Sequence, residues 1–280
     1  MFQMDAAEAW KQGASEPWED SPWPIDKPAN PTARADVAAL KLGMFTLPSL
    51  ENGVSQVIAS SIALRDDAAD LARTALDAPH LHGRMSLLRS AYYGLNRANN
   101  AQAEVVEHLG VAVSLLPTAD EISAYKGALL SMAATRRHMG NIALTVSLGR
   151  KSMAENERRV AGLSGRKMTP EQSESFMHQM SISDIDGSAA CTHFEQADVC
   201  LRRSGASLAE LTSSAIDLAV ANYLTDDHEL SQRWLVTALW RAGKAKIVHE
   251  AGADRAWRLA ITAARNHGNS EALSDLLHFD

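Results

Sequence analysis

Three aspartates lie close together in a stretch whose residue types and spacing could do chemistry. Asp66, Asp67 and Asp70 belong to the segment Asp66-Asp67-Ala68-Ala69-Asp70. Carboxylate oxygens are ligands that Mg²⁺ prefers, and a protein-bound Mg²⁺ often coordinates the phosphates of a substrate as well. The three side chains therefore offer a cluster of oxygen ligands at which a divalent cation could bind.

The same segment resembles the aspartate-rich D-D-x-x-D pattern of class I terpene and prenyl-diphosphate enzymes. That resemblance implies an all-helical, Mg-dependent enzyme that acts on a diphosphate through Asp66, Asp67 and Asp70. In that family the carboxylates face the pocket, whereas helical spacing turns Asp66 and Asp70 away from the apolar side of their own helix. We therefore expect a solvated helix face here and keep the enzyme as the alternative function.

Other chemical motifs give no coherent site. The residue types that bind zinc occur at His178, Cys191, His193 and Cys200, but their spacing fits no common zinc site. A phosphate-binding loop, a dinucleotide fingerprint and the H-E-x-x-H and G-x-S-x-G motifs are all absent from the sequence. We therefore expect no metal and no cofactor, and a catalytic role is the less favoured one.

The stretch from Thr118 to Val160 organises the rest of the chain. It follows Pro117 and opens with a capping box, in which Thr118 is the N-cap and Glu121 is the reciprocal partner. Apolar residues then recur at alternating spacings of three and four, which is a heptad pattern. A helix of this length extends over roughly 60 Å and needs partners of comparable length.

Two shorter helical runs precede this stretch. Apolar residues alternate by four and three from Leu50 to Ala75 and again from Met85 to Leu116. Because short connections make neighbouring helices antiparallel, the three runs predict an elongated antiparallel bundle of long, heptad-patterned helices. The expected fold class is therefore all-α.

Four polar residues interrupt the apolar seams of these helices: Ser61, Asn99, Gln102 and Arg136. Folding the helices about their short connections places all four at one level of the bundle. We favour a buried polar layer that fixes the register of the helices. The alternative is a small polar pocket in which Arg136 binds a carboxylate or a phosphate.

Shorter helices are predicted in the second half of the chain. Thr169-Pro170-Glu171-Gln172 carries the signals of a helix start, and residues 183–187 are expected to end that helix. A further helix with Phe194 and Leu201 would then be the fourth bundle member. Beyond Gly205, glycine-terminated helices predict a small helical-hairpin domain, so the bundle is expected to occupy residues 35–204 and the C-terminal domain residues 205–280.

Residues 1–34 differ from the rest of the sequence. Trp10, Trp18 and Trp23 are interleaved with prolines, and acidic residues outnumber basic ones. Prolines at this density are incompatible with a regular helix, which predicts an extended arm. Tryptophan is enriched at interface hot spots, so we expect the three tryptophans to bind the body of this chain or a partner.

Composition limits the partners that the chain can have. It has 280 residues, a net charge of -7 and two cysteines, with a pI of about 5.8. The acidic balance does not favour nucleic acid, and neither a signal peptide nor a membrane span is recognisable. We expect a protein that is cytoplasmic, or exported without a cleavable hydrophobic signal.

These observations favour a non-catalytic function. Long helices with apolar seams and an aromatic arm are typical of a protein-protein interaction module, such as a scaffold, adaptor, secreted effector or assembly component. The expected partner is another protein or a second copy of the chain, which would make it an oligomer. A small-molecule ligand is less favoured.

Overall fold

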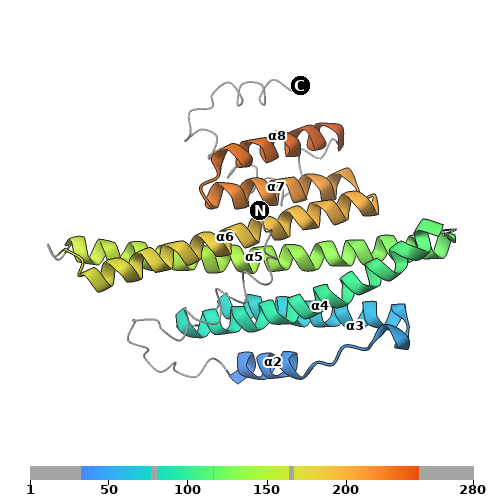
Figure 1. Ribbon diagram of the computed structural model, residues 1–280, viewed down its shortest axis with the longest axis horizontal. Coiled ribbons are helices and arrows are strands. Elements are labelled where there is room, and N and C mark those ends of the chain that lie inside the picture. The colour runs from blue at the N-terminus through green and yellow to red at the C-terminus, as the bar shows by residue number, and fades with distance from the viewer. Residues whose placement is uncertain (1–32, 77, 79–80, 116, 164–166, 246–280) are drawn as a thin grey trace. The chain divides into compact units, whose positions relative to one another are not determined.

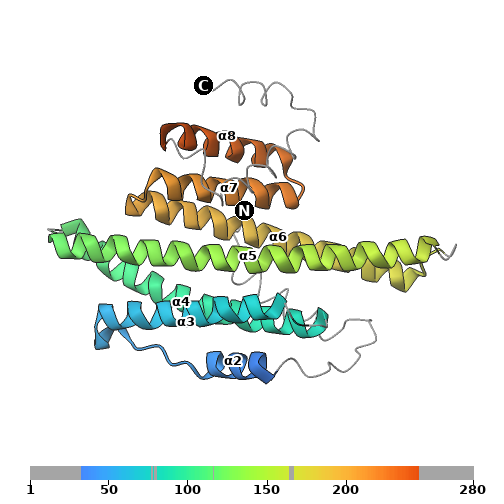
Figure 2. The ribbon, with the colours of Figure 1, turned by 180° about the vertical axis from the view of Figure 1, so that it is seen from behind.

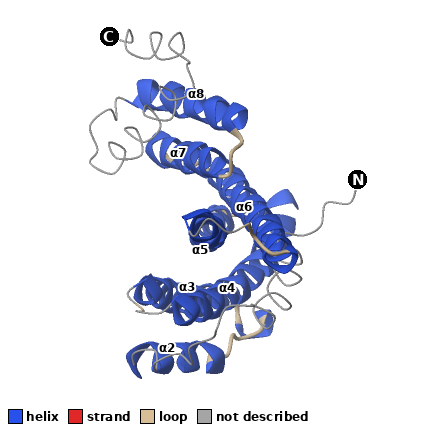
Figure 3. Cartoon of the chain, turned by 90° about the vertical axis from the view of Figure 1, so that its left-hand side faces the viewer, coloured by secondary structure: helices blue, strands red, loops and turns tan. Residues whose placement is uncertain are grey.

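A computed structural model describes residues 33–245 except 77, 79–80, 116 and 164–166. Every secondary-structure element in these ranges is helical, which confirms the predicted all-α class (Figures 1 and 3). The chain divides into two compact units, residues 1–193 and 194–280, which we describe separately. The predicted boundaries at 34/35 and 204/205 stay predictions, and Trp10, Trp18 and Trp23 lie outside the described residues.

The first unit contains the longest helix of the described residues. It contains α2 (Ala33–Met44), the short 3-10 helix η1 (Leu50–Asn52), α3 (Val54–Leu76), α4 (Leu81–Leu115), α5 (Ala119–Leu163) and most of α6 (Pro170–Ser204). The second unit contains the end of α6, α7 (Leu208–Leu224) and α8 (His228–Ala245). α3, α4 and α5 have 23, 35 and 45 residues.

The long helix α5 forms as the sequence predicts. The backbone N–H of Glu121 donates to Thr118 Oγ1 at 3.2 Å, and the backbone N–H of Thr118 donates to Glu121 Oε2 at 2.8 Å. This reciprocal cap satisfies two of the donors that a helix start leaves unpaired. From there α5 continues without a break to Leu163, a rise of about 67 Å.

The core of the first unit lies between helical layers. α3 and α4 lie side by side, α2 packs on one side of them and α5 on the other (Figure 3). Leucine and methionine side chains fill the space between these helices, and the largest of them that are fully buried are Leu64, Leu71, Leu88, Leu95, Leu129 and Met139. The burial of these apolar side chains makes the largest favourable contribution to the folding free energy of this unit.

The prediction that residues 183–187 end a helix is wrong. α6 runs through them from Pro170 to Ser204. The side chains of Ser183 and Asp186 are buried and hydrogen-bonded to Ser147 and Arg150 of α5. These tertiary contacts override the weak preference of serine, aspartate and glycine for turns.

The helix α2 was not anticipated from the sequence. Arg97 of α4 donates from its guanidinium to the backbone oxygens of Leu42 and Phe45 at the end of α2. A Cβ atom at Gly94 would lie only 2.7 Å from Leu42 Cδ2. Glycine at position 94 therefore allows α2 to pack closely against α4.

In the second unit, α7 and α8 pack against each other. α7 begins with the predicted capping box, in which the backbone N–H of Glu210 donates to Ser207 Oγ at 3.3 Å and that of Ser207 donates to Glu210 Oε2 at 2.9 Å. Asp227 caps α8, because its Oδ1 accepts from the backbone N–H of Leu230 at 3.0 Å. α8 continues past its predicted end at Gly243 to Ala245.

Candidate functional site

Gln102 joins three helices through hydrogen bonds in the core of the first unit. Its Nε2 donates to Ser61 Oγ on α3 at 3.3 Å and to Ser131 Oγ on α5 at 3.0 Å. All three residues are buried, and Gln102 and Ser61 are completely inaccessible to solvent. The structure therefore brings together two of the residues singled out in the sequence and adds Ser131, which was not singled out.

The other two polar seam residues lie on the same helices. Asn99 is buried on α4, about one turn before Gln102, and Arg136 is half-buried on α5. The side-chain oxygens Asn99 Oδ1 and Gln102 Oε1 are buried and accept no hydrogen bond from the described protein atoms. The anion-binding interpretation of Arg136 stays a prediction.

A second polar cluster connects α5 to α6. Ser147 Oγ donates to the backbone oxygen of Ser183 at 2.8 Å, and Ser183 Oγ donates to that of Ser147 at 2.9 Å. One turn along α5, Arg150 donates from Nε to Asp186 Oδ2 at 3.0 Å and from Nη1 to Gln179 Oε1 at 3.2 Å. These paired groups fix the register of α6 on α5.

Burial changes the acidity of the aspartate in this cluster. Desolvation raises the pKa of Asp186 to about 7, although the neighbouring Arg150 guanidinium acts in the opposite direction. Only 4% of the Asp186 side chain is exposed. A substrate cannot reach this carboxyl group, so its contribution is to the stability of the helix pair.

Tyr92 and His193 form a third buried contact. The Tyr92 hydroxyl lies 2.8 Å from His193 Nε2, and the ring centroids are 5.8 Å apart. Each residue is only 1% exposed. His193 therefore holds α4 against α6. Cys191 is half-buried and Cys200 is buried. No group of three or more His, Cys, Asp or Glu side chains that could hold a metal ion occurs in the described ranges.

The aspartates of the D-D-x-x-D segment are exposed on α3. Asp66 pairs with Arg65 at 2.8 Å and Asp70 with Arg73 at 2.7 Å, and Asp67 is exposed as well. The two aspartates that pair are 59% and 68% exposed. The carboxylates of Asp66 and Asp70 therefore contact neighbouring arginines and solvent.

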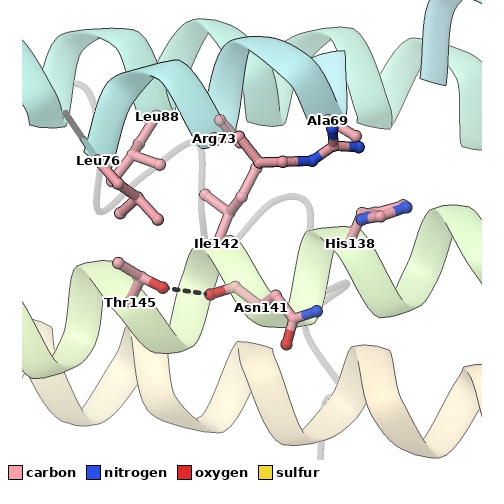
Figure 4. A pocket seen from close by; sticks show the side chains of 9 residues that line it. Ala69, Arg73, Leu76, Leu88, His138, Asn141, Ile142 and Thr145 are labelled. Carbon is pink, nitrogen blue, oxygen red and sulfur yellow. Dashed lines mark hydrogen bonds between the residues drawn. The ribbon is translucent and has the colours of Figure 1, made fainter. Parts of the chain in front are cut away.

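A cavity of about 260 Å³ lies beside this segment, between α3, α4 and α5. Its lining combines apolar and polar side chains, which Figure 4 shows from close by: Ala69, Ala72, Arg73, Leu76, Leu88, His138, Asn141, Ile142 and Thr145. Burial lowers the pKa of the half-buried His138, and the positive charges of Arg65, Arg73 and Arg137 lower it further. The cavity therefore has a mixed apolar and polar lining, and three arginines lie close to its His138 side.

The α5–α6 pair ends in a projecting tip, which we call the hairpin end and define as residues 154–163 and 167–177. Met85, near the start of α4, lies opposite Gly149, since its Sδ is 4.0 Å from the position of a Cβ there. Thus α5 extends about ten residues, or roughly 15 Å, past the first turn of α4. Figures 1 and 2 show α5 and α6 side by side at this end.

Apolar side chains are exposed at the hairpin end. Val160 is 57%, Leu163 82% and Met177 65% exposed. The guanidinium of Arg158 lies 6.0 Å from the centroid of the Phe176 ring, which links the two helices. The exposure of these residues could not be predicted from the sequence, because it depends on where α4 begins relative to α5.

A buried carboxylate organises the second unit. Asp198 accepts from Arg241 Nη1 at 2.8 Å and from Arg202 Nε at 2.9 Å, and its side chain is fully buried. Arg241 also donates to the backbone oxygen of Leu211 at 2.6 Å. The aspartate thus ties α6, α7 and α8 together.

Comparisons with protein-family models, with curated proteins and with solved structures give no match to this chain. Within the described ranges, no helix combines the length and apolar character that a membrane span requires.

Proposed function

We propose that this chain is a non-catalytic helical interaction module that self-associates through the hairpin end. The observation that carries the proposal is the exposure of Val160, Leu163 and Met177 on a tip that α4 does not cover. Val160 and Leu163 are three residues apart and therefore share one face of α5. Exposed apolar side chains that are neighbours on a surface mark interaction sites, and Val160 and Leu163 are such neighbours.

A second copy of the chain suits the geometry of this surface. Two helices alone bury each other along only one side, whereas two hairpins packed together form a four-helix arrangement with an enclosed core. A twofold axis would place the same surface of both copies in contact, as in most homo-oligomers. The role that follows is that of a scaffold or assembly component.

The charges at the hairpin end also favour self-association. Among the described residues it carries three exposed bases and three exposed acids: Arg158, Arg159, Lys167, Glu155, Glu171 and Glu174. A surface with both signs interspersed can be complementary to a second copy of itself. A partner with a strongly acidic or basic surface would be a poorer match.

A non-catalytic role is supported by the state of the ionisable side chains. Arg150 with Asp186, and Tyr92 with His193, are buried pairs that connect helices. Their partners are already satisfied inside the protein, so these groups act in packing. Val160, Leu163 and Met177, in contrast, are exposed.

Light scattering tests the proposal. We expect the natural chain to form a dimer at micromolar concentration and the variant Leu163→Glu/Met177→Glu to be a monomer, because burying two carboxylates at the contact is costly. The matched control is Val111→Glu/Leu115→Glu, which places the same charges on exposed apolar positions of α4. A natural chain that remains monomeric, or equal dimerisation of both variants, would contradict the proposal.

A further inference from the structure

The cavity between α3, α4 and α5 is the right size for one large side chain. Its volume of about 260 Å³ is below the range of roughly 300 to 1,000 Å³ typical of small-molecule sites. Leu88 and Ile142 are buried in its lining, and Leu76 is half exposed. In Figure 4, Leu76 and Leu88 lie at the left, Ile142 lies beside Arg73 in the centre, and the His138 ring lies at the right. An aromatic ring would complete this partly buried apolar cluster.

Positive charge surrounds the cavity. Arg65, Arg73 and Arg137 all lie close enough to His138 to act on it electrostatically. Residues 122–154 of α5 include no aspartate or glutamate. The acids beside the cavity are Asp66 and Asp70 of α3, which are exposed. The Arg73–Asp70 pair is exposed on both sides, and exposed ion pairs contribute little to stability, so an incoming carboxylate can replace Asp70 at little cost.

The sequence contains a segment with matching chemistry. Glu16-Pro17-Trp18-Glu19-Asp20 places one aromatic side chain between carboxylates on both sides. Tryptophan is the side chain with the largest apolar surface, and it is costly to leave in water. The segment thus offers an aromatic ring for the cavity and negative charges for the arginines around it.

We propose that Trp18 of this chain inserts into the cavity of the same molecule, while Glu16 and Asp20 pair with arginines of α3. Arg65 and Arg73 are eight residues apart on α3, which corresponds to about 12 Å along the helix axis. Glu16 and Asp20 are four residues apart, which spans about 13 Å in an extended chain. The backbone spacing of Glu16 and Asp20 therefore matches that of Arg65 and Arg73 along α3.

The connection to α2 is long enough for this contact. Ala33 comes thirteen positions after Asp20, and an extended chain over thirteen steps reaches about 43 Å. α2 packs on α3 and α4 and begins beside the half of α3 that carries Arg73 (Figures 1 and 2). A covalent tether of this kind gives a local concentration on the order of 1 mM. This inference does not depend on association through the hairpin end.

Fluorine NMR of the full chain labelled with 5-fluorotryptophan tests the proposal. The Trp18 resonance is identified from its loss in Trp18→Phe, and a soluble paramagnetic agent reports its exposure. We expect Trp18 to be at least threefold better protected than Trp10. Arg73→Glu should remove that protection, because it replaces the positive charge that would pair with a carboxylate of the Trp18 segment. Arg73 is 74% exposed, so this replacement leaves the fold intact. Ala72→Phe, which fills the cavity, should do the same.

The control variant is Arg159→Glu, which reverses an exposed charge at the hairpin end and should leave Trp18 protected. A Trp18 resonance as accessible as that of Trp10 would overturn the proposal. So would protection that survives both Arg73→Glu and Ala72→Phe. Protection that disappears on tenfold dilution would show that Trp18 occupies a second copy, which also contradicts insertion within one molecule.

Discussion

Arg150 and Asp186 show how strongly one buried contact constrains this protein. Arg150→Met leaves the Asp186 carboxyl group buried without its cationic partner, and we expect a loss of about 3 to 5 kcal/mol in the free energy of unfolding. The double variant Arg150→Met/Asp186→Leu should recover most of it, because both buried polar groups are then removed. Urea unfolding followed by circular dichroism measures these differences, and equal stability of the single and double variants would contradict the expectation.

The raised pKa of Asp186 predicts a specific pH dependence. The carboxyl group titrates at about 7 in the folded protein instead of the ordinary 3.8, so between these values the folded state binds its proton more tightly. Its contribution to stability is therefore full below pH 3.8 and is lost as the pH rises to about 7. Over this interval the free energy of unfolding can fall by as much as about 1.4 kcal/mol per pH unit.

Asp186→Asn provides the comparison, because asparagine does not titrate. Relative to this variant, the free energy of unfolding of the natural chain should fall as the pH rises across that interval. Urea titrations at several pH values measure the difference. Parallel pH profiles for the two proteins would show that Asp186 titrates normally.

Local residue patterns were readable from the sequence, and distant pairs were not. The caps at Thr118 and Ser207 were predicted, because both partners of each lie within four residues of one another. The partner of Asp186 is 36 residues away, so the same aspartate was interpreted as a turn residue. The cationic surroundings of His138 could not be predicted either, because the arginines around it belong to two helices.

At the scale of elements, Gly94 controls how α2 packs. Replacing a helical glycine by alanine normally stabilises a helix by about 1 kcal/mol. In the natural chain we expect Gly94→Ala to give no such gain, because the new Cβ would be 2.7 Å from Leu42 Cδ2. In a Leu42→Ala background the same substitution should stabilise the protein. Thermal unfolding of the four proteins measures this coupling, and an identical effect in both backgrounds would contradict it.

The long helices were more predictable than the short one. α5 was expected from a proline-free stretch with a cap and a regular apolar seam, and it extends only to Leu163 beyond the predicted Val160. α2 lacks comparable signals in its 12 residues and depends on contacts with Gly94 and Arg97 of α4. The hairpin end was not foreseen, because its exposure follows from the relative register of α4 and α5.

For the whole molecule, the magnesium-dependent alternative has a direct test. Asp66 and Asp70 are exposed and paired with neighbouring arginines. We therefore expect Mg²⁺ with pyrophosphate to change the melting temperature of the natural chain no more than that of Asp66→Ala/Asp70→Ala. A thermal shift that disappears in the double variant would favour the diphosphate enzyme instead.

The central claim is that copies of this chain meet at the hairpin end. A photo-crosslinking amino acid at position 160 tests it most directly, because such a group reacts with whatever lies beside it. With the group at 160 we predict a covalent product of twice the 30.2 kDa chain mass, and with the group at the exposed position 115 we predict none. No dimer from position 160, or equal yields from both positions, would contradict the claim.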